Sequence, residues 1–212
     1  MPSGTSAKRL VADGYDQIAD GLASLRRAGT PSGRKQAYLK QLTSGIADGA
    51  WVLDLGCGPG EQAAWLNERF RVAGVDISRA QLALARAAAP DAALLLGDMC
   101  SLPFRSGSIA AIAAIYSIIH VPREAHEPLF AMLYEALQPG GRLFAVLGAT
   151  SWEGTEENWL DLGATMFWSH DSADIGVALL EQAGFEVEDA QVEPDELVGS
   201  GAHLFVLAEK PA

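Results

Sequence analysis

The stretch WVLDLGCGPG, residues 51–60, joins a run of apolar residues to three glycines at alternate positions. Residues 51–55 have the near-continuous apolar character of a strand that is covered on both faces, with Asp54 as the exception. Glycines let the backbone turn sharply and come close to a ligand. Residues up to Arg69 then suit a helix, so the stretch predicts a strand, a ligand-facing turn and a helix in succession.

The same rhythm continues along the chain. Short apolar runs alternate with helical patterns, which predicts a parallel sheet covered on both faces, and the last two strands, with no helix between them, should be antiparallel. We therefore expect an α/β fold with a doubly wound sheet, preceded by N-terminal helices and by small polar residues 1–7 without regular structure. The further strands are expected at 72–75, 94–96, 109–116, 142–147, 185–192 and 203–209, and the helices at 8–25, 32–42, 79–89, after Pro122, and from Ser172 to Gly184.

Composition and charge narrow the class of protein. The 212 residues suit one domain, and the net charge of −12 disfavours nucleic acid and anionic membranes as partners. Two cysteines, Cys57 and Cys100, do not make a disulfide framework, and the first residues do not read as a signal peptide. The longest apolar run, residues 109–119, is too short to span a bilayer. We expect a soluble, cytoplasmic protein.

Two further carboxylates stand at predicted strand ends. Asp76 follows Gly56 by 20 residues, where a carboxylate can accept from both hydroxyls of a ribose, and Asp98 ends the third strand, where it can accept from an adenine amine. Strand-end carboxylates also cap helices, which is the alternative for both. The glycine spacing is G-x-G-x-G, whereas dinucleotide-binding proteins use G-x-G-x-x-G.

With these residues in place, the chain resembles the class I S-adenosylmethionine-dependent methyltransferases, in their small-molecule branch. The matching motifs are DLGCGPG (54–60), GVDIS (74–78), GDMCSLPF (97–104) and LQPGGRLF (137–144). The resemblance implies a Rossmann-like sheet of seven strands in the order 3-2-1-4-5-7-6 with the last strand antiparallel. It also implies S-adenosylmethionine as cofactor and S-adenosylhomocysteine as product.

The resemblance further assigns roles to residues and segments. Asp54 would face the methionine amine, Asp76 the ribose, and Asp98 with Met99 the adenine, while Tyr15, in a Tyr-Asp-x-x-Ala segment, would cover the methionine part or simply pack within its helix. The expected segments are a helical lid (1–48), a cofactor core (49–148), an aromatic insert (149–171) and a C-terminal part (172–212). The expected cofactor-binding residues are Tyr15, Asp54, Gly56, Gly58, Gly60, Asp76, Ile77, Gln81, Asp98, Met99 and Tyr116.

Candidates for the chemistry follow the fourth strand and lie in the irregular, aromatic-rich insert. His120 can take a proton near neutral pH or can be a loop histidine bonded to backbone, and His170 is the second catalytic candidate. The insert suits the wall of an apolar pocket, or else packs on the sheet edge or against a second subunit. Its pocket candidates are Trp152, Trp159, Met166 and Trp168. The four histidines show no metal-ligand spacing with the cysteines.

The preferred hypothesis is in-line transfer of a methyl group to the oxygen, nitrogen or carbon of a small, partly apolar molecule, by a monomer or homodimer. An alternative is a protein that binds the cofactor without transferring its methyl group, in a regulatory or rearrangement role. An oxidoreductase dependent on NAD is disfavoured by the glycine spacing and by the missing Tyr-x-x-x-Lys pair.

Overall fold

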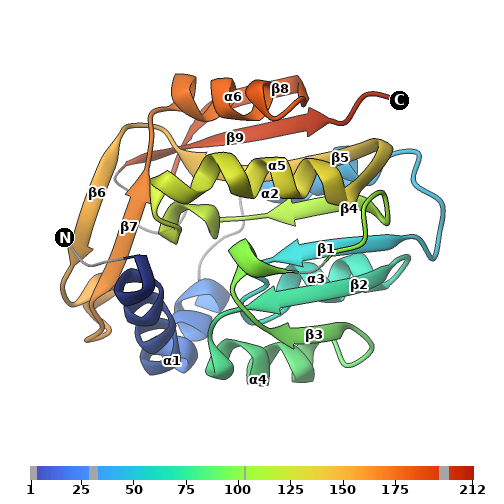
Figure 1. The fold of residues 1–212 in the computed structure, drawn as a ribbon. Coiled ribbons are helices and arrows are strands. Elements are labelled where there is room, and N and C mark those ends of the chain that lie inside the picture. The colour runs from blue at the N-terminus through green and yellow to red at the C-terminus, as the bar shows by residue number, and fades with distance from the viewer. Residues whose placement is uncertain (1–3, 29–32, 103, 196–200) are drawn as a thin grey trace.

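The computed structural model describes residues 4–28, 33–102, 104–195 and 201–212. Its centre is a seven-stranded sheet in the order β3-β2-β1-β4-β5-β9-β8, in which β1 to β5 are parallel and β9 runs antiparallel to both of its neighbours (Figure 1). The predicted doubly wound sheet, its strand order and its antiparallel final pair are confirmed. The strands are β1 (Trp51–Leu55), β2 (Arg71–Asp76), β3 (Ala93–Leu96), β4 (Ile109–Ala114), β5 (Leu137–Gly148), β8 (Glu186–Pro194) and β9 (Ala202–Glu209).

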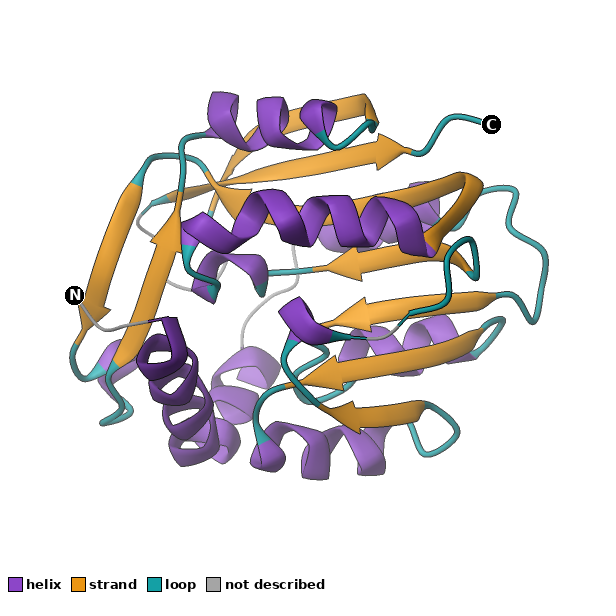
Figure 2. Ribbon diagram, in the orientation of Figure 1, coloured by secondary structure: helices purple, strands orange, loops and turns teal. Residues whose placement is uncertain are grey.

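Helices cover both faces of this sheet, as the fully buried central strands require (Figure 2). One apolar core joins α5 and α6 to the sheet, and a second joins α2 and α3 to the opposite face. The side chain of Ser78 caps α4 by accepting from the backbone N–H of Gln81. The helices are α1 (Gly4–Ala28), α2 (Arg34–Leu42), α3 (Glu61–Asn67), α4 (Arg79–Ala88), α5 (His126–Ala136) and α6 (Ala173–Gln182), with short 3-10 helices η1 (Met99–Ser101), η2 (Ile118–His120), η3 (Arg123–Ala125) and η4 (Trp159–Asp161).

The expectation of an irregular insert at 149–171 is wrong. Strands β6 (Trp152–Glu156) and β7 (Met166–His170) form a separate two-stranded antiparallel sheet. Pairing satisfies the backbone of both segments, and the buried side of β7 packs on α1 in a third apolar cluster. The hairpin and α1 therefore stand together beyond the carboxyl ends of the parallel strands (Figure 1).

Several predicted boundaries also differ. Helix α1 begins at Gly4, so residues 4–7 are ordered, and Ala7 is 1% exposed against the hairpin cluster. Strand β4 ends at Ala114, ahead of the expected end at 116, and β5 begins at Leu137, ahead of the expected start at 142. Ser172 precedes α6 but makes no side-chain cap. Of the helices in the described ranges, none combines the length and the apolar character that a bilayer crossing requires.

Candidate functional site

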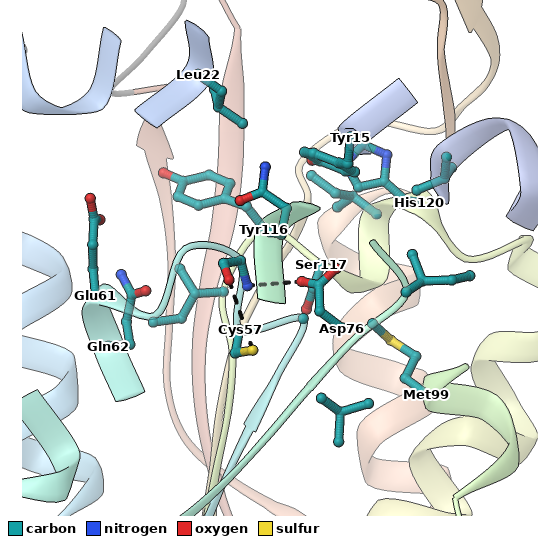
Figure 3. Close-up of a pocket in the computed structure, with 18 of the residues that line it drawn as sticks. Tyr15, Leu22, Cys57, Glu61, Gln62, Asp76, Met99, Tyr116, Ser117 and His120 are labelled. Atoms are coloured by element: carbon teal, nitrogen blue, oxygen red, sulfur yellow. Dashed lines mark hydrogen bonds between the residues drawn. The ribbon is translucent and has the colours of Figure 1, made fainter. Parts of the chain in front are cut away.

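A cavity of about 540 Å³ opens beyond the carboxyl ends of the parallel strands, the place where doubly wound sheets bind their ligands (Figure 3). Its floor comes from the loops that follow β1, β2, β3 and β4, and its walls come from α1, α2, η2 and the β6-β7 hairpin. Most of the site residues predicted from the sequence lie on the lining of this cavity. Those on its lining are Tyr15, Gly56, Gly58, Asp76, Ile77, Gln81, Asp98, Met99, Tyr116, His120, Trp159 and Trp168.

The glycine loop has no room for a side chain at either of its two ends. Gly56 has a φ of 74°, and a Cβ there would overlap the side chain of Ser117. Gly60 has a φ of 85°, and its Cβ would lie 2.8 Å from the Cα of Ala85 in α4. Gly60 therefore lets α3 approach α4 and is not on the cavity lining. Between them, Gly58 lies on the lining and donates its N–H to Asp76 (2.8 Å).

Asp54 lies within β1, just behind the glycine loop, and is 2% exposed. Burial, and then the nearby charge of Asp76, raises the pKa of Asp54 to about 7, although a hydrogen bond from the backbone of Ala63 opposes the shift. Its Oδ2 has no hydrogen-bond partner within the part of the chain that the structure describes, and the same is true of both side-chain polar atoms of the buried Gln81. Buried polar atoms of this kind are rare unless a ligand satisfies them.

Asp76 ends β2 with both carboxylate oxygens directed at backbone N–H groups. It accepts from Gly58 and from Ser78, each at 2.8 Å. Burial raises its pKa, while those two hydrogen bonds and the guanidinium of Arg26 in α1 act in the opposite direction. Carboxylate oxygens can accept further hydrogen bonds, so Asp76 keeps the capacity to bind hydroxyl groups in the cavity.

Asp98 carries a contact that the sequence did not suggest. Its Oδ2 accepts from the Nζ of Lys8 in α1 (2.6 Å), and its Oδ1 accepts from the backbone of Cys100 (2.9 Å). Burial acts to raise the pKa of Asp98, but these two bonds outweigh it and the pKa is lowered. Lys8 also lines the cavity, so the N-terminal helix is tied by an ion pair to the adenine end of the expected cofactor site.

Tyr15 and His120 meet on the cavity wall, where Figure 3 shows them side by side. The Nδ1 of His120 lies 2.7 Å from the carbonyl oxygen of Phe167, which can only accept, so Nδ1 carries the proton. Its Nε2 therefore accepts from the Tyr15 hydroxyl, also at 2.7 Å. Burial lowers the pKa of His120 to about 4, so the ring is neutral at neutral pH. Burial also raises the pKa of Tyr15, so its hydroxyl stays protonated.

Of the site residues predicted in the segment 149–171, some line the cavity and the others lie outside it. Trp159 packs edge-on against Tyr15, with ring centroids 6.0 Å apart, and Trp168 lies 4.4 Å from the His120 ring. Met166 is fully buried beside α1 and is not on the lining, and Trp152 is 43% exposed. His170 is also off the lining: its Nδ1 bonds the carbonyl of Thr150 (2.6 Å).

Sequence reasoning missed several polar residues of the lining, and four of them are Lys8, Arg26, Asp195 and His203. The Nε2 of His203 lies 2.8 Å from the Oδ2 of Asp195. None of the four stands in a motif, and Lys8 is 90 positions away from the carboxylate that it contacts. Among the described residues, no group of three or more His, Cys, Asp or Glu side chains is arranged to hold a metal ion.

A family model described as a methyltransferase domain matches residues 52–141, which include the glycine loop, both later carboxylates and β4. A trans-aconitate 2-methyltransferase of Variovorax paradoxus is 39% identical over 101 residues, covering 46% of this chain and 38% of that protein. The chain spans between about a third and three fifths of the length of the curated relatives that it matches, 37% to 57%.

Two of the solved structures that resemble this chain are matched over its whole length. One is a 1,6-didemethyltoxoflavin-N1-methyltransferase of Burkholderia thailandensis, with its namesake acceptor and S-adenosylhomocysteine bound (TM-score 0.75, 16% identity, 100% of this chain and 92% of that chain). The other is the [4+2]-cyclase SpnF (TM-score 0.75, 17% identity, 100% and 97%). At these identities the likeness concerns the fold.

Proposed function

We propose that the chain is a class I S-adenosylmethionine-dependent methyltransferase and that it transfers a methyl group to a small, partly apolar molecule. S-adenosylmethionine is the cofactor of this family. When bound, it supplies a methyl group on a positively charged sulfur. A nucleophile can attack the methyl carbon, and the carbon–sulfur electron pair then stays on the sulfur as the leaving group. The chain itself has to align the acceptor and exclude water, and to take a proton where the nucleophile carries one.

One observation carries the proposal: Asp54, Asp76 and Asp98 belong to the carboxyl ends of three neighbouring strands. Asp76 and Asp98 line the cavity, and Asp54 is buried in β1 just behind the glycine loop. The residues fit the cofactor. The unpartnered Oδ2 of Asp54 suits its ammonium group, Asp76 its ribose hydroxyls, and Asp98 its adenine amine. Gln81, whose amide is buried without a partner among the described residues, is a further candidate for a polar edge of the nucleoside.

The acceptor side supports a small aromatic or apolar molecule. Tyr15, Tyr116, Trp159 and Trp168 form much of its wall, and aromatic side chains provide large apolar contact areas. The indole Nε1 of Trp168 is buried and has no partner in the described part of the chain, so it can donate to an oxygen of the acceptor. We propose that α1 and the β6-β7 hairpin close this side, as lid and acceptor wall.

Titration calorimetry of the chain with S-adenosylmethionine, S-adenosylhomocysteine and NAD tests the cofactor, with Asp76→Ala as the control for site-specific binding. Mass-spectrometric detection of S-adenosylhomocysteine during incubation with candidate acceptors then tests transfer. Micromolar binding of both sulfur compounds, with turnover of an acceptor, supports the proposal. Binding without turnover of any acceptor would favour the alternative role without methyl transfer, and binding of NAD alone would refute the proposal. A cytoplasmic location, a monomeric or homodimeric state and the absence of nucleic-acid partners stay predictions.

A further inference from the structure

Two polar side chains of the cavity lining come from the C-terminal part of the chain, outside the matching motifs. Asp195 follows β8, and His203 is the second residue of β9. Because β9 runs antiparallel, its first residues lie beside the last residues of β5, and His203 is paired with Gly148. The topology therefore places this histidine at the same edge of the sheet as the glycine loop, although 143 positions separate it from Gly60.

The contact between Asp195 and His203 fixes which ring nitrogen of His203 carries the proton. The Oδ2 of Asp195 lies 2.8 Å from Nε2 of His203, and both side chains are largely buried. A carboxylate accepts, so Nε2 carries the proton, and in the neutral ring Nδ1 holds a free lone pair. This Nδ1 is buried and has no hydrogen-bond partner within the described residues. The ring packs edge-on against Tyr116, another residue of the cavity lining, with centroids 5.0 Å apart.

The other three of the four histidines are engaged elsewhere. Both ring nitrogens of His120 are bonded, to Tyr15 and to the carbonyl of Phe167. His126 is buried and bonds the carbonyl of Val121 (3.0 Å), and His170 lies off the cavity lining. His203 is thus the histidine of the lining that combines a carboxylate partner with an unengaged nitrogen.

We propose that His203 is the catalytic base of the acceptor site, positioned by Asp195, and that the acceptor is an aromatic hydroxyl. This inference rests on the proposed methyl transfer. The O–H bond of the acceptor breaks, its proton goes to Nδ1 of His203, and the oxygen electron pair forms the bond to the methyl carbon. The bond from that carbon to the sulfur breaks at the same time, and its electron pair stays on the sulfur. Asp195 stabilises the imidazolium that results. A base serves a phenol, whose pKa is near 10, whereas a carboxylate arrives already ionised.

Other charged and titratable groups surround His203. Glu193 of β8 is its register partner across the sheet and forms an ion pair with Arg34 of α2 (3.2 Å). Lys35 of α2 lies over the Tyr116 ring, 5.8 Å from its centroid. His120 and His170 lie within electrostatic range of His203. Asp195 is the group among these that is in hydrogen-bond contact with the ring.

Nitrogen-15 NMR of the full chain with S-adenosylhomocysteine bound tests the dyad without any acceptor. The neutral His203 ring should carry its proton on Nε2, and Asp195→Asn, which removes the accepting carboxylate, should reduce the share of this tautomer. Glu186→Gln, which removes an exposed charge from β8, should leave that share unchanged. A proton on Nδ1, or the same share of the two tautomers in Asp195→Asn as in the wild type, would overturn the proposal.

Turnover tests the role as base and the class of acceptor. S-adenosylhomocysteine formation is measured with phenol, catechol and 2-naphthol as hydroxyl probes and with trans-aconitate as the carboxylate probe. We expect turnover of hydroxyl probes that falls about 10²- to 10⁴-fold in His203→Gln, the range for a lost general base, with S-adenosylhomocysteine affinity kept. The rate of hydroxyl-probe turnover should also fall in Asp195→Asn and stay at the wild-type value in Glu186→Gln.

The two proposals fail in different ways. Turnover of trans-aconitate alone, or of a hydroxyl probe at an unchanged rate in His203→Gln, would overturn the base and its acceptor class while leaving methyl transfer standing. If the wild-type chain binds S-adenosylmethionine and turns over no acceptor, the proposed methyl transfer fails, and the inference that depends on it fails too, whatever the spectra show for the ring.

Discussion

Replacing Asp54 with asparagine should stabilise the protein at alkaline pH. Asp54 is buried beside Asp76, and its pKa of about 7 stands well above the usual 3.8. The folded state therefore binds a proton that the unfolded state has lost, and stability falls as pH rises from about 4 to about 7, then levels off. Each tenfold step in the ionisation constant is worth about 1.4 kcal/mol, so the full cost of ionising Asp54 reaches about 4 kcal/mol.

Asparagine keeps the shape of the side chain and cannot ionise. The difference in unfolding free energy between Asp54→Asn and the wild type should therefore grow by about 2 kcal/mol in favour of the variant between about pH 5.5 and about pH 8.5. Urea denaturation of both proteins at the two pH values, without cofactor, measures it. A difference that is the same at both pH values would refute the reasoning, because Asp54 would then not be the group that titrates.

The same substitution should have the opposite effect on ligand binding. If the Oδ2 of Asp54 receives the ammonium group of the cofactor, its loss removes a charged hydrogen bond worth about 1.5–3 kcal/mol, or roughly 10- to 150-fold in affinity. Titration calorimetry with S-adenosylhomocysteine measures this change, and 5′-methylthioadenosine, which lacks the amino-acid part, serves as the control. Equal weakening for both ligands would separate Asp54 from the ammonium group.

Three other substitutions address separate parts of the site. Asp76→Ala should weaken S-adenosylhomocysteine binding by about 1–3 kcal/mol through lost hydrogen bonds to the ribose, and unchanged affinity in calorimetry would remove Asp76 from the site. Gly60→Ala should lower the unfolding free energy by about 1–3 kcal/mol, because its φ is 85° and the new Cβ meets the backbone of Ala85; thermal denaturation matching the wild type would contradict this. Tyr15→Phe keeps the ring and loses the bond to His120, so unfolding free energy should fall by about 1 kcal/mol with ligand affinity kept; an equal loss of affinity would mean that the hydroxyl contacts the ligand.

The sheet could be predicted from the sequence because its signals are local. Each central strand is a short apolar run next to a glycine or carboxylate, and Ser78 stands directly before the helix that it caps. The hairpin at 152–170 was not predicted because its two strands lack such local signals. Its strands contain Gly154 and several charged or polar residues, and β6 is half exposed, so neither has the apolar run or clean alternation that marks a strand. Pairing with each other and packing of β7 on α1 hold them, and those contacts are not local.

The residues of the site also differ in how far the sequence predicts their positions. Asp54, Asp76 and Asp98 stand at or close to the carboxyl ends of their strands, so their meeting at one edge follows from the parallel sheet. The contacts of Lys8 with Asp98 and of Asp195 with His203 depend on how α1 crosses the strand ends and on the register of β8 and β9. No spacing in the sequence encodes either one.

The hydrogen bond between Tyr15 and His120 changes the roles that the two residues can have. From the sequence, Tyr15 had a role at the cofactor and His120 a role as base, and the two could be considered separately. The hydrogen bond between them couples these roles: while it is made, the Nε2 lone pair of His120 is occupied, and His120 can take a proton from an acceptor only through the Tyr15 hydroxyl or after that bond breaks. With a pKa of about 4, His120 also holds a proton weakly. The geometry therefore favours His120 as the residue that holds Tyr15 and the hairpin in place, since its other nitrogen bonds the backbone of β7, and it leaves the proton to the second histidine of the cavity.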